Sequence, residues 1–289
     1  MLDGLSLIWP WNPGVIVLLL ILSLLYLLGL WRTRKCMVKD EQDTPIKTKH
    51  IIMFFSAIII SALVLLTPVD TIARTQLFSV HMAQLVILTT LCAPLILFGC
   101  PASLLRPLIE LPVIGGILRA ITRPLVASIA FNLIFLLWHT PRIFHIALTN
   151  GVLYHVEILS IFMAALLNWW PLLGSVRELR RMSYPLQMLY AFFDGQPVDI
   201  FAFVLVFTGV AIYPYYAVPP QLGISTFADQ AAGGALLLVP GLVDLVVMSP
   251  LFFRWLGQIE NQTKLADQQR QEEGEEEYEE DEVEETSEA

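Results

Sequence analysis

Four of the five histidines stand at the ends of apolar segments or in the loop between two of them, where side chains from different segments can meet. They are His81, His139, His145 and His155. Neutral imidazole is a common ligand of copper, zinc and haem iron, and several imidazoles can converge without burying a net charge. A single histidine at a helix end needs no metal, so the prediction depends on the group. The pattern predicts a metal or haem site that uses at least two of them.

Three side chains near these histidines could add ligands. Met82 follows His81, and its thioether would favour the cuprous ion. Adjacent helical residues point about 100° apart, however, which makes Met82 a weaker candidate. Asp229 and Gln230 precede an apolar segment and could supply an oxygen ligand or accept a hydrogen bond from an imidazole N–H.

Three aspartates, Asp194, Asp199 and Asp244, lie inside apolar segments and indicate a second kind of chemistry. At about 1.5 Å per residue, Asp199 and Asp244 each fall near the middle of a bilayer. A carboxylate there is costly unless it is protonated, paired or hydrated. We therefore expect these acids to meet each other or a polar group such as Asn132. Protonated acids that merely hydrogen-bond neighbouring helices are the structural alternative.

The elements that must position these residues are transmembrane helices. Of the 289 residues, 56% are apolar and 15% are charged, and the mean hydropathy is +0.67. A bilayer core about 30 Å thick requires roughly 20 apolar residues in a helix, because every backbone polar group must be satisfied within the segment. The sequence therefore predicts an all-α, multi-pass protein of the cell membrane with seven helices. The windows are 15–30, 51–67, 80–98, 124–140, 154–173, 188–213 and 232–253.

Lysine and arginine gather in alternate loops, which sets the expected orientation. Basic residues near helix ends stay on the cytoplasmic side. Loops one, three and five carry Arg32, Arg34, Lys35, Lys39, Lys47, Lys49, Arg106, Arg119, Arg123, Arg177, Arg180 and Arg181. The other loops hold only Arg74 and Arg142. We expect the N-terminus outside, the C-terminus inside, and the four histidines at the outer face.

Three regions follow from this topology. Residues 1–14 form an outer N-terminal segment, 15–257 the membrane domain, and 258–289 an acidic tail. The formal net charge of −9 comes mostly from that tail, whose composition predicts a disordered cytoplasmic extension. Cys36, Cys92 and Cys100 are widely spaced, which indicates lone thiols.

No phosphate-binding loop, dinucleotide fingerprint, nucleophile elbow or HExxH motif occurs, so an enzyme of a familiar class is not expected. Two alternatives to a copper-handling protein stay open. One is electron transfer through a haem held by two histidines, and the other is transport coupled to protons through the intramembrane aspartates.

Several short groups of residues, in order along the helices, carry a family resemblance. They are SVHMAQ at 79–84, Ala93 and Pro94, GCP at 99–101, Tyr154 and His155, NWWP at 168–171, Asp229 and Gln230, Gly233 and Gly234, and FFRW at 252–255. By these residues the chain resembles the CtaG family, assembly factors of caa(3)-type cytochrome c oxidase. The resemblance covers most of the membrane region.

The resemblance implies a non-catalytic role in maturing a haem–copper oxidase, by supplying copper to an outward-facing subunit or by stabilising it. It supports His81, His155 and, less directly, Asp229, whereas His139 and His145 rest on the residue pattern alone. Some relatives have a second histidine one turn after the first, where this chain has Leu85. We expect His81 and His155, with His139 as a third candidate, to hold a cuprous ion. The expected partners are oxidase subunits and the lipid bilayer, with no nucleic acid.

Overall fold

The computed structural model describes residues 5, 7–35, 46–176, 179 and 182–288, which form helices and connecting turns without any strand. The basic residues Lys39, Arg177, Arg180 and Arg181 lie outside the described residues. The elements are α1 (Pro13–Lys35), α2 (Thr48–Leu65), α3 (Pro68–Thr75), α4 (Phe78–Val86), the π-helix η1 (Ile87–Cys92), α5 (Ala93–Gly99), α6 (Ala102–Ile109), α7 (Pro112–Ile121), α8 (Pro124–Trp138), α9 (Pro141–Thr149), α10 (Gly151–Leu173), α11 (Tyr184–Asp194), α12 (Gln196–Phe207), the 3-10 turn η3 (Pro220–Leu222), α13 (Thr226–Leu237) and α14 (Val239–Glu288).

Within the described ranges, six helical segments are long and apolar enough to cross a bilayer. They are α1, α2, α4 to α5, α10, α11 to α12, and α13 with the first part of α14. The pair α7 and α8 qualifies only jointly and is bent by 74°. Each predicted window falls on one of these segments. The prediction of an all-α, multi-pass membrane protein is therefore confirmed, with six spans, or seven when the bent pair is counted.

Three spans are interrupted where proline removes a backbone donor. The π-helix η1 stands just before Pro94. Gly195 separates α11 from α12, which has Pro197 in its first turn, and Leu238 separates α13 from α14, before Pro240. The windows 188–213 and 232–253 are therefore each a pair of helices rather than one.

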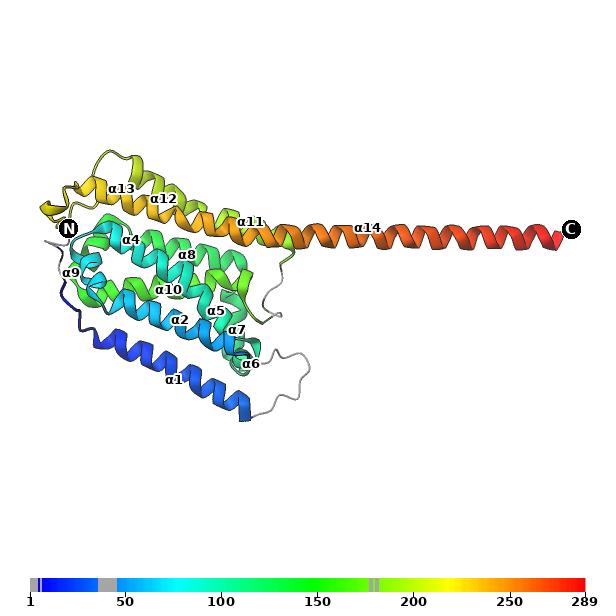
Figure 1. Ribbon diagram of the computed structural model, residues 1–289, viewed down its shortest axis with the longest axis horizontal. Coiled ribbons are helices and arrows are strands. Elements are labelled where there is room, and N and C mark those ends of the chain that lie inside the picture. Colours follow the sequence, from blue (N-terminus) through cyan, green and yellow to red (C-terminus); the bar gives the residue numbers. More distant parts are fainter. Residues whose placement is uncertain (1–4, 6, 36–45, 177–178, 180–181, 289) are drawn as a thin grey trace.

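The helices run side by side in a bundle (Figure 1). Helix α1 lies at one edge next to α2, and α13 and α14 lie at the opposite edge. The N-terminus, α9 and the start of α4 share one end of the bundle. Helices α6 and α7 and the projecting part of α14 mark the other end. The histidines at the start of α4 and the end of α8 therefore lie far from the acidic tail.

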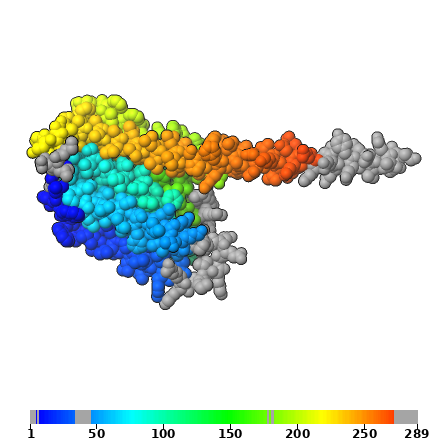
Figure 2. Space-filling view, viewed as in Figure 1, coloured from blue at the N-terminus to red at the C-terminus, as the bar shows by residue number. Residues whose placement is uncertain are grey.

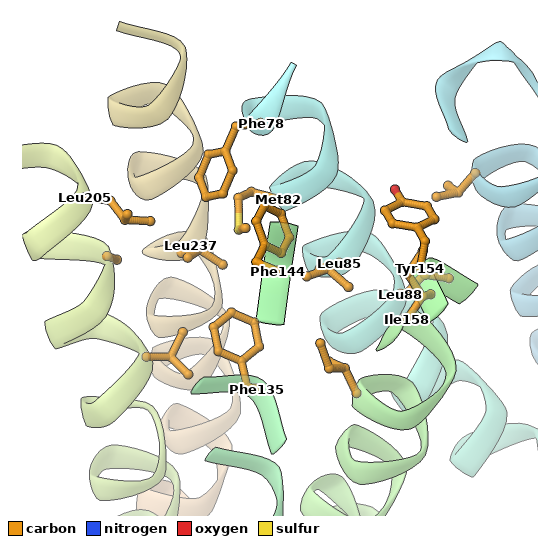
Figure 3. Close-up of a cluster of buried hydrophobic side chains, with 14 of the residues drawn as sticks. Phe78, Met82, Leu85, Leu88, Phe135, Phe144, Tyr154, Ile158, Leu205 and Leu237 are labelled. Atoms are coloured by element: carbon orange, nitrogen blue, oxygen red, sulfur yellow. The ribbon is translucent and has the colours of Figure 1, made fainter. Parts of the chain in front are cut away.

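The main hydrophobic core surrounds α4, which places polar residues of that helix deep inside the protein. Phe78, Met82 and Leu85 of α4 pack against side chains from α8, α9, α12 and α13 (Figure 3). Those partners include Phe135, Phe144, Leu205 and Leu237. Because α4 is enclosed on several sides, His81 and Gln84 are also buried, at 0% and 1% exposed.

The acidic residues after 257 form the C-terminal part of α14 in the structure. Helix α14 continues from the bundle to Glu288 and projects beyond it (Figure 1). The coloured part of α14 also projects beyond the bundle in the space-filling view (Figure 2). Its residues include many good helix formers, and a polar helix keeps its side chains hydrated without needing a core. One supporting pair is Lys264 Nζ with Glu260 Oε1, 2.8 Å apart and one turn along the helix.

Candidate metal centre

Two imidazoles and one carboxylate converge at the end of the bundle that holds the N-terminus. His81 lies on α4, His139 caps the C-terminus of α8, and Glu157 lies on α10. All three are buried. Glu157 Oε1 is 3.3 Å from His81 Nε2 and 3.9 Å from His139 Nε2. The three candidate ligand atoms lie within 4.8 Å of one another, so three separate helices form one possible metal site.

The hydrogen bonds of each imidazole determine which nitrogen carries the proton. His139 Nδ1 lies 2.7 Å from the carbonyl oxygen of Phe135, which can only accept, so Nδ1 is protonated. His81 Nδ1 lies 3.2 Å from the hydroxyl oxygen of Tyr154, and that hydroxyl donates its own proton to Gln84 Oε1 at 2.6 Å. His81 Nδ1 must therefore donate as well. Both imidazoles thus turn a lone pair on Nε2 toward Glu157.

The atoms that face one another in this centre lack hydrogen-bond partners. In the described part of the chain, no group donates a hydrogen bond to Nε2 of His81 or His139, or to either carboxylate oxygen of Glu157. Buried polar atoms rarely remain unpaired, because each costs about 1–3 kcal/mol. One proton on Glu157 could form a hydrogen bond with only one of the two nitrogens, whereas a cation could bind all three ligand atoms.

The donor set is typical of a transition metal. Imidazole nitrogen suits copper, zinc, iron and nickel, and two histidines with one carboxylate leave positions open for a further ligand. The packing does not favour a haem at this place. Phe144 contacts both rings, with centroids 5.2 Å from His81 and 5.4 Å from His139, and Glu157 lies between the two unprotonated nitrogens.

His155 does not join His81, contrary to the predicted pair. Its Nδ1 donates to the carbonyl oxygen of Gly151 at 2.6 Å, and its Nε2 lies 3.4 Å from Asp70 Oδ2. Asn12 Nδ2, just before α1, lies 3.2 Å from both His155 Nε2 and Asp70 Oδ2. The amide of Asn12 therefore bridges Asp70 Oδ2 and His155 Nε2. These contacts attach the N-terminal segment to the bundle.

Two other predicted candidates also lie away from the centre. His145 on α9 contacts Tyr215, with ring centroids 4.1 Å apart and the ring planes tilted by 32°. Met82 is fully buried in the apolar core, and a Cβ on Gly233 of α13 would stand 3.2 Å from its Cγ. This agrees with the expectation that neighbouring residues of one helix face different directions.

Asp229 and Gln230 of α13 hold backbone groups together instead of facing the imidazoles. Asp229 accepts hydrogen bonds from the N–H groups of Phe78 and Ser79 at 2.6 and 3.2 Å, and from the Ser79 hydroxyl. Gln230 bonds to Ile212, Tyr213, Leu205 and Val210. A carboxylate at the N-terminus of a helix is favourable for both capping and dipole reasons. The structure therefore uses Asp229 to cap α4 and not as a ligand.

Sequence reasoning missed Glu157 and Asp70. Glu157 is an acid within the apolar window 154–173, and it belonged with the three intramembrane aspartates that were singled out. Asp70 follows the second window, and nothing in its sequence context marks it as buried, although it is only 3% exposed. The position of Glu157 inside an apolar window could have identified it, whereas no feature of the sequence could have identified Asp70.

The three predicted intramembrane aspartates do gather. Asp194, Asp199 and Asp244 all line a cavity of about 60 Å³ at the break between α11 and α12. Asn132 bonds to Asp194 rather than to the other two, donating to its carbonyl oxygen at 3.0 Å and to its Oδ1 at 3.4 Å. Asn168 also donates to the Asp194 side chain. Asp194 is thus bound by amides, while Asp199 and Asp244 face the cavity without such bonds in the described residues.

Comparison with known proteins supplies the family. The family model of the cytochrome c oxidase caa3 assembly factors (Caa3_CtaG) matches residues 24–258 of the sequence. No curated protein and no solved structure matches the chain. The matched range includes every residue of the candidate metal centre and every residue that lines the aspartate cavity. The chain therefore belongs to the caa3 cytochrome c oxidase assembly factor family.

Proposed function

We propose that this protein binds a copper ion at His81, His139 and Glu157 and passes it to a subunit of cytochrome c oxidase in the cell membrane. Membership of the assembly factor family supports the choice of partner. The positive charge of the alternate loops supports an outward-facing centre. In this proposal copper is the cargo, and the protein catalyses no reaction.

The observation that carries the proposal is the convergence of three buried ligand atoms that lack a hydrogen-bond partner among the described residues. Nε2 of His81, Nε2 of His139 and Glu157 Oε1 face a common position. Because no thioether or thiolate of the described residues joins the site, the donor set fits the cupric ion better than the cuprous ion. Among divalent first-row metals copper also binds such donors most tightly.

Deletion of the gene followed by complementation tests the function in cells. We expect the deletion strain to retain oxidase polypeptides in its membranes but to lose oxidase activity and oxidase copper. The wild-type gene should restore both, and the double variant His81→Ala with His139→Ala should restore neither. Full restoration by the double variant, expressed at the wild-type level, would contradict the proposal.

A second candidate function is proton-coupled carriage, and the aspartate cavity is the observation that favours it. Two of its carboxylates, those of Asp199 and Asp244, approach Gly195, where an added Cβ would stand 3.7 and 3.5 Å from their Oδ2 atoms. Midplane carboxylates of this kind are typical of transporters. A carrier would lose its flux in reconstituted vesicles when both are changed to asparagine. An assembly factor should show no proton flux in either form, which is the result we expect.

A further inference from the structure

A line of hydrogen bonds leads from His81 to the buried Asp70, which lies beside the partly exposed His155. His81 Nδ1 lies 3.2 Å from the Tyr154 hydroxyl, which donates to Gln84 Oε1 at 2.6 Å. Gln84 Nε2 in turn donates to Asp70 Oδ1 at 3.1 Å. In Figure 3 the Tyr154 hydroxyl points toward the end of the bundle at which Phe78 lies. The metal centre is thus connected to groups outside it.

The groups at the Asp70 end of this line determine which partner donates in each hydrogen bond. The Asp70 carboxylate and the carbonyl oxygen of Val64 can only accept, and both contact Gln84 Nε2, at 3.1 Å each. The amide oxygen of Gln84 must therefore face Tyr154, and Tyr154 must donate to it. The oxygen of Tyr154 is then left to accept the Nδ1 proton of His81.

Water cannot easily replace any of these partners, because they are buried. Tyr154, Gln84 and Asp70 are 0%, 1% and 3% exposed. The second imidazole has no such dependence, since His139 donates directly to the backbone carbonyl of Phe135. The position of the proton on His139 is therefore set within its own helix, whereas the position of the proton on His81 depends on side chains from α3 and α10.

We infer that Tyr154 is a positioning residue of the metal centre: with Gln84 and Asp70 it holds the proton of His81 on Nδ1 and leaves Nε2 ready to bind the metal. This inference rests on the proposed function. Hydrogen-bond partners of metal-ligating histidines typically contribute ten- to a hundredfold in affinity, because they orient the ring and set its tautomer. Tyr154 does not itself contact the metal position.

The test compares Tyr154→Phe with Tyr26→Phe in the purified full-length protein. Tyr26 is a matched control, because its buried hydroxyl donates to the carbonyl oxygen of Gly99, away from the centre. We expect Tyr154→Phe to weaken Cu²⁺ binding by about ten- to a hundredfold in a competition titration. The electron paramagnetic resonance spectrum of the bound cupric ion should also change, which a loss of stability alone would not cause. Tyr26→Phe should leave both unchanged.

A second variant covers the case in which Tyr154→Phe does not fold. Asp70→Asn keeps Tyr154 but removes one of the two acceptor-only groups that orient Gln84, leaving the carbonyl oxygen of Val64 as the other. We expect it to weaken Cu²⁺ binding severalfold. Wild-type affinity and spectrum in the folded variants would overturn the inference while leaving the proposed function intact. A wild-type protein that binds no Cu²⁺ would overturn the proposed function and this inference with it.

Discussion

Replacing Glu157 with glutamine is expected to reduce the affinity of the purified protein for Cu²⁺ by more than about a hundredfold, since even the outer partners of metal ligands contribute ten- to a hundredfold. Glutamine has the same shape but no charge, and its amide would donate a hydrogen bond to an imidazole Nε2. That bond would occupy the lone pair that the metal needs. A competition titration with a coloured copper chelator measures the affinity, and circular dichroism checks the helix content.

His155→Ala is the matched control for that experiment. The sequence pattern pairs His155 with His81, whereas the structure places it on Asp70 and Asn12. We expect His155→Ala to bind Cu²⁺ within about threefold of wild type, well below the ten- to a hundredfold range of groups that bond to a metal ligand. Loss of copper in His155→Ala together with wild-type binding in Glu157→Gln would favour the predicted pair and reject the three-residue centre.

Gly234→Leu is expected to have the largest effect on stability, lowering the free energy of unfolding by about 3 kcal/mol, the upper part of the usual range for overpacking. A Cβ at this position of α13 would stand 2.9 Å from the backbone oxygen of Ala202 and 2.9 Å from Leu205 Cβ. One of these atoms is a backbone oxygen and the other a Cβ, and neither moves when a side chain changes rotamer, so a rotamer change cannot relieve the contact. Small residues permit such close helix packing in membranes. The midpoint of thermal denaturation in detergent measures the effect.

Gly257→Ala provides the comparison at an open position of α14. An added Cβ there meets nothing within 4 Å. Alanine in a helix is favoured over glycine by roughly 0.5–1 kcal/mol, so the midpoint should stay the same or rise slightly. Equal losses of stability in both glycine variants would show that the close approach of α12 and α13 does not explain the result.

The membrane architecture could be predicted because its cause is local. Each spanning helix satisfies its own backbone hydrogen bonds, so an apolar run of sufficient length is enough to reveal it. The window 154–173 lies within α10, for example. The interruptions at Gly195 and Leu238 were harder to predict. Proline after a break is visible in the sequence, but neighbouring helices decide whether the chain bends or continues there.

Two of the three residues of the candidate site could be named from the sequence. Histidines at helix ends indicated a metal centre, and His81 and His139 do meet. Their partner is Glu157, which lies two residues after the predicted His155. On a helix, two positions along the chain correspond to nearly opposite faces. A sequence places a residue at a depth in the membrane, but it does not set the rotation of the helix about its axis.

By itself, then, the sequence determined an all-α membrane protein, its family likeness, and the end of the bundle at which imidazoles gather. Only the tertiary structure decided which side chains meet. The three ligands come from α4, the end of α8, and α10, and Leu85 leaves α4 with a single histidine at this place. The packing of α4 against α8, α10 and α13 sets the rotation of each helix. That rotation directs Glu157 toward His81 and His139, Asp229 toward the start of α4, and His155 toward the N-terminal segment.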